Sequence, residues 1–153
     1  MISKASVAKH PIHPMLVPLP IGLWIFSLVC DVIYKSNGDL LWNTMAHYSL
    51  AGGIVGGLLA ALPGLIDLLA LPSSSAKRIG LWHLGLNLGI TGLYIANFFW
   101  RRGDPTAAGP FAISILAIVL LAASGWLGGE MVYVHGVAVA HADETGTAKK
   151  HPA

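Results

Sequence analysis

Histidine and carboxylate side chains stand inside a chain that is otherwise strongly apolar. The candidates for chemistry are His13, Asp67, His83, Glu130 and His135, each within or at the end of an apolar run. Imidazole binds haem iron, and imidazole together with carboxylate suits zinc, iron or manganese. Ionisable groups cost free energy inside a membrane and usually mark a functional site. These five residues are therefore the first candidates for a cofactor or metal site.

The apolar runs around these residues predict the architecture. They cover residues 15–34, 44–71, 79–100 and 110–134, and a run of about 20 apolar residues matches a hydrocarbon core of about 30 Å. Hydrophobic residues make up 55% of the chain and charged residues 10%, with a mean hydropathy of +0.68. Backbone groups in lipid must bond within helices, and short connections favour antiparallel neighbours. We therefore predict an all-α fold, an integral membrane up-down four-helix bundle.

The remaining composition excludes several classes of protein. The four spans leave no room for a soluble module, so residues 1–137 are predicted to form one transmembrane domain, followed by a short polar tail, residues 138–153. The net charge of +2 is spread over the loops, which argues against nucleic-acid binding. The chain shows no nucleophile–base arrangement, phosphate loop or dinucleotide fingerprint. We therefore expect no autonomous catalytic activity.

Loop charges predict the orientation in the membrane. With four spans, both termini and the connection at residues 72–78 share one side, which carries six basic residues against three on the other. Cytoplasmic loops are enriched in Lys and Arg, so both termini are predicted to be cytoplasmic. Arg101 and Arg102, on the other side, are expected to be interfacial anchors that reach the lipid headgroups.

Depth then separates the polar residues into two groups. The cytoplasmic side is predicted to hold His13, Asp67, His83, Asn87, Glu130 and His135. His83 and Asn87 are four residues apart and share a helix face. The outer side holds Asp31, His47 and Asn97, and in a purely structural interpretation Asp31 would pair with His47 without any chemistry.

Small residues predict how the helices approach each other. Glycine pairs at four-residue spacing, such as Gly52 with Gly56 and Gly85 with Gly89, are expected to bring helices together within one bundle. The tryptophans are expected to form an aromatic belt near the span ends. The tetrapeptide IGLW at residues 21–24 recurs at 79–82, which would relate the first span to the third.

Longer motifs resemble a known family. The segments HPIHPMLVPLPIGLW, PGLIDLL, WHLGLN and GWLGGEMVYVHG resemble the bacterial four-helix membrane family known as domain of unknown function 2231, over residues 10–137. The resemblance implies a small multi-pass domain of the bacterial inner membrane with histidines near its helix ends, sometimes joined to redox modules. The family implies no activity.

Two interpretations of the histidines involve a bound group. The first is one b-type haem for membrane electron transfer, with His83 as one axial ligand, His13 or His135 as the other, and Asn87 beside them. The second is a divalent metal ion held by His13, His83 and His135 together with Asp67 and Glu130.

Two further interpretations need no cofactor. The carboxylates and histidines could form a hydrogen-bond network that joins helix ends in a non-catalytic accessory subunit, bound to other membrane or redox subunits or to copies of itself. Alternatively, Asp67 and Glu130 near one mouth of the bundle could serve the movement of protons or ions.

Overall fold

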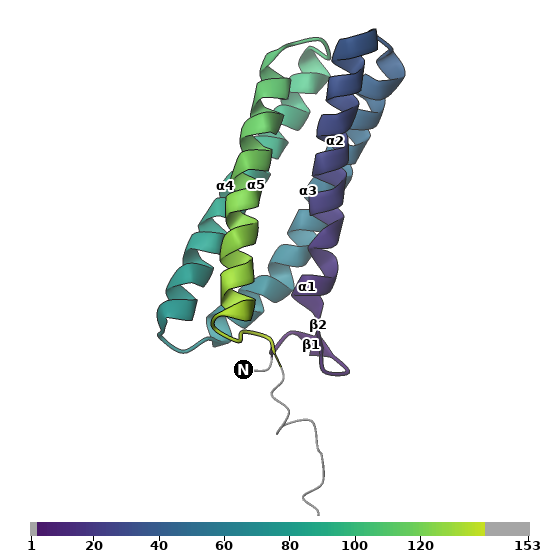
Figure 1. The fold of residues 1–153 in the computed structure, drawn as a ribbon. Coiled ribbons are helices and arrows are strands. Elements are labelled where there is room, and N and C mark those ends of the chain that lie inside the picture. The colour runs from purple at the N-terminus through teal and green to yellow at the C-terminus, as the bar shows by residue number, and fades with distance from the viewer. Residues whose placement is uncertain (1–2, 140–153) are drawn as a thin grey trace, which may run out of the picture.

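Four long helices cross the molecule in an up-down arrangement, as predicted (Figure 1). The computed structural model describes residues 3–139. Each long helix is apolar enough to cross a membrane, and α1 and α2 together form one span, Ile12–Asn37. The helices are α1 (Ile12–Leu16), α2 (Pro18–Asn37), α3 (Leu40–Ala70), α4 (Ser75–Gly103) and α5 (Gly109–Tyr133).

The bundle has two distinct ends. We call the end with the N-terminus and the connection at residues 71–74 the proximal end, and the opposite end the distal end (Figure 1). At the distal end, Gly38 adopts the left-handed conformation with φ 72°, and Asp39 caps α3 by accepting from the N–H of Leu41. At the proximal end, Ser74 caps α4 by accepting from the N–H of Lys77. Local sequence signals thus fix both turns.

The segment before α1 forms a small β-hairpin that the all-α prediction did not include. Strand β1 (Ser6–Val7) pairs in antiparallel fashion with β2 (His10–Pro11). The turn residues Ala8 and Lys9 both have positive φ, 49° and 67°, as a tight two-residue hairpin turn requires. The prolines near residue 11 favour extended backbone, which here becomes strand.

The bundle consists of two helical hairpins. The first hairpin, α1–α3, packs through glycines of α3: Gly53 lies under the Trp24 indole, and a Cβ there would come within 2.3 Å of Trp24 Nε1. The prediction of a peripheral Trp24 was wrong, because this residue is 2% exposed and stacks on Tyr94. The second hairpin, α4–α5, differs: a Cβ at Gly85 or Gly89 would meet nothing within 4 Å. Those glycines face outward, contrary to expectation.

Three pairs of side chains join the first hairpin to the second across the bundle interior. Each pair connects α1 or α2 with α4, and in each the two residues lie 70 positions apart. Along α4 the pairs are separated by about 16 Å and about 10 Å, from the 1.5 Å rise per residue. We call these the central pairs: His13 with His83, Trp24 with Tyr94, and Asp31 with Arg101.

The two hairpins also contain equivalent internal hydrogen bonds. In the first hairpin, the Ser27 hydroxyl donates to the Ala46 carbonyl at 2.8 Å. In the second, the Asn97 amide donates to the Pro110 carbonyl, also at 2.8 Å. Ser27 and Asn97 are again 70 positions apart. Each follows the aromatic residue of its own hairpin, Trp24 or Tyr94, by three positions. The hairpins are therefore related by an approximate two-fold axis along the bundle, as in membrane folds with parallel repeats.

This axis corrects the register of the internal repeat. The equivalent segments are GLWI at residues 22–25 and GLYI at 92–95, each preceded at the same distance by a histidine, His13 or His83. The similarity of 21–24 to 79–82 does not correspond to equivalent positions. The equivalent segment of the third span begins about three turns after residue 79.

Gly53 provides a test of this packing. Gly53→Ala should lower the free energy of unfolding by about 1–3 kcal/mol, because the new methyl group meets an indole that Tyr94 holds from the other side. Thermal unfolding of the detergent-solubilised protein, followed by tryptophan fluorescence, measures the effect. Gly22→Ala is the matched control, since a Cβ there meets nothing within 4 Å. Equal melting temperatures for both variants would contradict the proposed Trp24 packing.

Candidate functional site

Two histidines from different hairpins meet near the proximal end. The ring centroids of His13, in α1, and His83, in α4, lie 6.3 Å apart, and the ring planes are nearly perpendicular at 87°. Both side chains are partly buried. Of the histidines predicted as ligands, these are the two that the fold brings together. The pair lies on the two-fold axis.

Each imidazole is fixed by its own hairpin in the same way. His13 Nδ1 lies 2.8 Å from the Ala60 carbonyl of α3, and His83 Nδ1 lies 2.9 Å from the Ser124 carbonyl of α5. Because a carbonyl only accepts, each Nδ1 carries the proton and the neutral ring keeps a lone pair on Nε2. Bonding of one ring nitrogen to a carbonyl is the usual arrangement that orients a histidine ligand.

A glycine lies beside each ring, four residues after the residue whose carbonyl accepts the hydrogen bond from Nδ1. A Cβ at Gly64 would lie 2.7 Å from His13 Nδ1, and a Cβ at Gly128 would lie 3.3 Å from His83 Cε1. A side chain at Gly64 would therefore displace the imidazole. Alanine at Gly128 would also be tight. The glycines are thus part of the site, and they too occupy equivalent positions in the two hairpins.

Asn87 belongs to the site through a neighbour. Its amide donates to the Ser124 hydroxyl at 2.6 Å and to the His83 carbonyl at 2.8 Å. The Ser124 hydroxyl in turn lies 3.1 Å from His83 Nδ1. Asn87 therefore contacts the Ser124 hydroxyl, which in turn supports the His83 ring. The sequence analysis did not identify Ser124 or Gly64 as neighbours of the histidines.

The other three predicted ligands are not gathered around the histidine pair. Across residues 3–139 there is no group of three or more His, Cys, Asp or Glu side chains that could hold a metal ion. Asp67 accepts from the Ser3 hydroxyl at 2.7 and 2.9 Å and from the Ala5 N–H at 2.9 Å. Its carboxylate therefore ties the N-terminal segment to α3. The predicted five-residue metal site is not assembled.

Glu130 and His135 lie at and beyond the last turn of α5. The Glu130 carbonyl accepts from the main-chain N–H of Val134 and His135, at 3.0 and 3.2 Å, where the helix ends. Because α5 ends at Tyr133, His135 belongs to the turn that follows and not to the helix face that presents Ser124. The ring that faces His83 is that of His13.

A second polar cluster occupies the distal end. Asp31 accepts two hydrogen bonds from the Arg101 guanidinium, at 2.6 and 2.5 Å, and both side chains are 4% exposed. Arg101 Nε also donates to Asn97 at 2.7 Å, and Asn97 donates to the Ser114 hydroxyl at 2.9 Å. The expected pairing of Asp31 with His47 was wrong: His47 stacks on Phe98, with ring centroids 4.6 Å apart.

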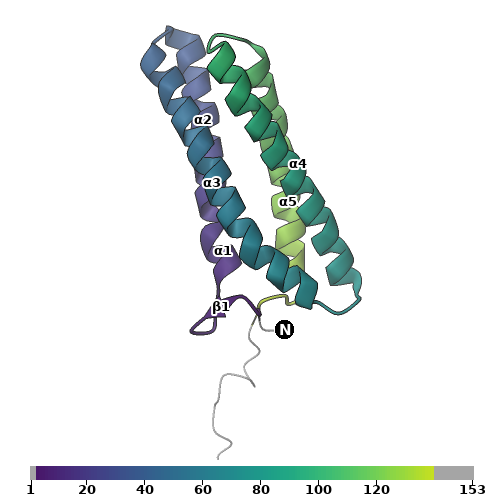
Figure 2. The ribbon, with the colours of Figure 1, turned by 180° about the vertical axis from the view of Figure 1, so that it is seen from behind.

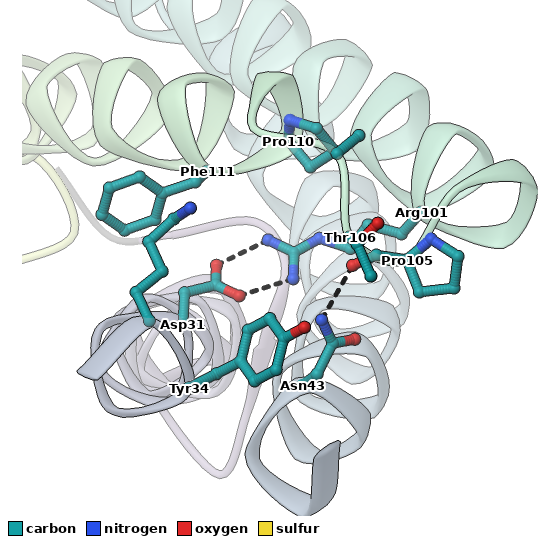
Figure 3. Close-up of a pocket in the computed structure, with 10 residues that line it drawn as sticks. Asp31, Tyr34, Asn43, Arg101, Pro105, Thr106, Pro110 and Phe111 are labelled. Atoms are coloured by element: carbon teal, nitrogen blue, oxygen red, sulfur yellow. Dashed lines mark hydrogen bonds and ion pairs between the residues drawn. The ribbon is translucent and has the colours of Figure 1, made fainter. Parts of the chain in front are cut away.

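Arg101 is therefore not an interfacial anchor. Figure 3 shows its guanidinium facing Asp31 between α2 and α4, beneath the connection that precedes α5. The Asn43 amide donates to the Pro105 carbonyl of that connection at 2.8 Å, and the Lys35 ammonium lies 4.9 Å from the centroid of the Phe111 ring. These contacts cover the ion pair at the distal end, which explains its burial.

Comparisons with known proteins identify a family but no function. No curated protein and no solved structure matches the chain. The family described as "Predicted membrane protein (DUF2231)" matches residues 9–141. Because the match covers most of the chain, the protein belongs to the DUF2231 family of predicted membrane proteins.

Proposed function

We propose that this membrane protein binds one b-type haem between His13 and His83 and serves in electron transfer. The observation that carries the proposal is the pair of imidazoles on the two-fold axis, each held through Nδ1 with Nε2 available. Haem iron is well held by two axial histidines from different helices of an apolar bundle. Bound haem supplies a reversible one-electron change; the protein holds and orients its ligands.

The distance between the rings fits this arrangement. Imidazole nitrogens bind metals at about 2.0–2.1 Å, so two rings on opposite sides of one metal atom have centroids roughly 6 Å apart. The separation of 6.3 Å agrees with that requirement.

The surroundings also favour a large apolar ligand over a hydrated metal ion. Ala60 and Gly64 on one side, and Ser124 and Gly128 on the other, present only small side chains beside the rings. Carboxylate next to the macrocycle would be unfavourable, and Asp67 is instead bonded to the N-terminal segment. Two imidazoles without a carboxylate would suit haem iron, which would take its other four ligands from the porphyrin.

A non-catalytic accessory role is the second candidate. The same hydrogen bonds that fix the imidazoles also join α1 to α3 and α4 to α5, so they stabilise the bundle with or without a cofactor. On this alternative, the histidine pair is an interhelical network and the protein is colourless. The absorption spectrum separates the two functions.

The proposed location is the bacterial inner membrane with the proximal end, and hence the histidine pair, on the cytoplasmic side. The burial of Arg101 against Asp31 strengthens this assignment, because a neutralised arginine no longer counts toward the positive charge of the distal end.

Reporter fusions test the orientation. A reporter fused after residue 153 should report the cytoplasm, and one inserted at residues 38–39 should report the opposite side. The expectation follows from the excess of Lys and Arg at the proximal end. Activity of an externally active reporter at the C-terminus would show that the orientation is reversed.

Haem binding is tested by the visible spectrum of protein purified from cells with ample haem supply. We expect a low-spin Soret band that shifts on reduction. His13→Ala and His83→Ala should each abolish the six-coordinate spectrum, and to a similar extent, because the two ligands are equivalent about the axis. Asn87→Ala should weaken haem binding by about 10–100-fold, as the loss of a residue that supports a ligand does.

Two other histidines provide matched controls. His47→Ala and His135→Ala should leave the band intact, since His47 stacks on Phe98 at the distal end and His135 follows the end of α5. A colourless wild-type protein under the same conditions would overturn the haem proposal and favour the accessory role. Loss of the band in His135→Ala but not in His13→Ala would show that the second ligand was assigned wrongly.

A further inference from the structure

The two histidines of the site differ in how the main chain that carries them is held. His83 lies in the continuous helix α4, eight residues after that helix begins. His13 is the second residue of α1, which is only five residues long. Pro18 and Pro20, at the start of α2, have no N–H to donate to the carbonyls of α1. A helix as short as α1 is not stable by itself, so the main chain at His13 needs support from elsewhere.

The N-terminal segment, residues 3–11, supplies that support. The N–H of Ile12 donates to the Ala5 carbonyl at 2.9 Å, which closes the β-hairpin directly before the histidine. The N–H of Ala5 in turn donates to Asp67 at 2.9 Å, and the Ser3 hydroxyl donates to the same carboxylate. Figures 1 and 2 show this segment crossing the proximal end, from the turn after α5 to α1. Two successive main-chain hydrogen bonds therefore join Asp67 of α3 to the start of α1.

Asp67 is the point at which the two hairpins differ beside the histidines. On α3, the residue whose carbonyl binds the imidazole and the glycine beside the ring are followed, three positions later on the same face, by Asp67. The same series on α5 ends in Met131. Met131 packs against α4, since a Cβ at Gly80 would lie 3.3 Å from its Sδ. An apolar contact thus suffices beside the continuous helix, whereas α3 carries a carboxylate that binds the non-helical chain before His13.

We propose that Asp67 is a positioning residue for His13, acting through residues 3–11, and that His13 is the exchangeable ligand of the histidine pair. The inference rests on the proposed haem function. While Asp67 holds the N-terminal segment, α1 presents His13 opposite His83. When the segment is released, α1 loses its anchor and His83 remains in its helix as the one protein ligand. Release therefore frees one axial position for a small external ligand.

The visible spectrum of full-length Asp67→Ala tests the proposal. The ratio of six-coordinate to five-coordinate haem should fall by about 10–100-fold, because His13 loses a residue that supports it. Free imidazole should restore the low-spin band by taking the place of His13. Ser3→Ala removes one contact and should give an intermediate ratio. Asp67→Asn should stay close to wild type, since its amide can accept from the Ala5 N–H and donate to the Ser3 hydroxyl.

Asp39→Ala is the matched control for a general loss of stability. Asp39 also accepts a main-chain hydrogen bond at one end of α3, from the N–H of Leu41 at 2.9 Å, but it lies at the distal end. This variant should keep the wild-type ratio of six-coordinate to five-coordinate haem. An equal change in Asp39→Ala and Asp67→Ala would overturn the proposal.

Trypsin digestion of the haem-free protein in detergent measures the anchor itself. The peptide bond after Lys4 adjoins the contact with Asp67, and Ala5 is buried. Cleavage after Lys4 should therefore be about tenfold faster in Asp67→Ala than in wild type, because a hydrogen bond to a carboxylate is lost. Cleavage after the exposed Arg102, at the distal end, is the internal reference.

The outcomes separate this inference from the haem proposal. If wild-type protein binds haem and Asp67→Ala has the same spectrum, the inference is overturned and the haem proposal stands. Equal cleavage after Lys4 in the two proteins, or failure of imidazole to restore the low-spin band, would also overturn it, because Asp67 would then not hold the segment or would support the fold in general. A colourless wild-type protein would overturn both.

Discussion

Asp31 and Arg101 must pair inside the apolar bundle, because a buried charge without its partner strongly destabilises the fold. Their bidentate contact therefore fixes the rotation of α2 relative to α4 about the bundle axis. Once this rotation is set at the distal end, residues at helical intervals along α4 also face the axis. Tyr94 meets Trp24, and His83 meets His13. The candidate site at the proximal end thus depends on an ion pair about 27 Å away along the helix.

In the interior between these ends, the polar contacts within a hairpin differ in kind from the central pairs between hairpins. Buried polar side chains mostly donate to main-chain carbonyls of the partner helix in the same hairpin, as Ser27, Asn97 and both site histidines do. The three central pairs across the axis are two ring contacts and one ion pair. In the described chain, two buried donors, Trp24 Nε1 and Tyr94 Oη, have no hydrogen-bond partner. Their cost is offset by stacking at 4.4 Å between centroids and by close packing on Gly53.

The approximate two-fold axis relates the side chains that meet at the two ends of the bundle. A duplicated hairpin places equivalent residues opposite each other, which suits a cofactor that takes two identical ligands. The equivalence is broken in one layer, where Asp31 of the first hairpin meets Arg101 of the second.

The sequence by itself determined the number of spans, their up-down order and the presence of histidines near one end, because hydropathy and helix geometry act locally. It also indicated that His83 and Asn87 share a face. Only the tertiary structure decided which groups meet. Depth along a helix follows from residue number, but rotation about the helix axis depends on packing with other helices. For that reason Arg101 could be mistaken for a surface anchor, His135 and His13 could not be distinguished as partners of His83, and Ser124 and Gly64 were overlooked. Rotation is set by long-range contacts such as the Asp31–Arg101 pair, which joins residues 70 positions apart.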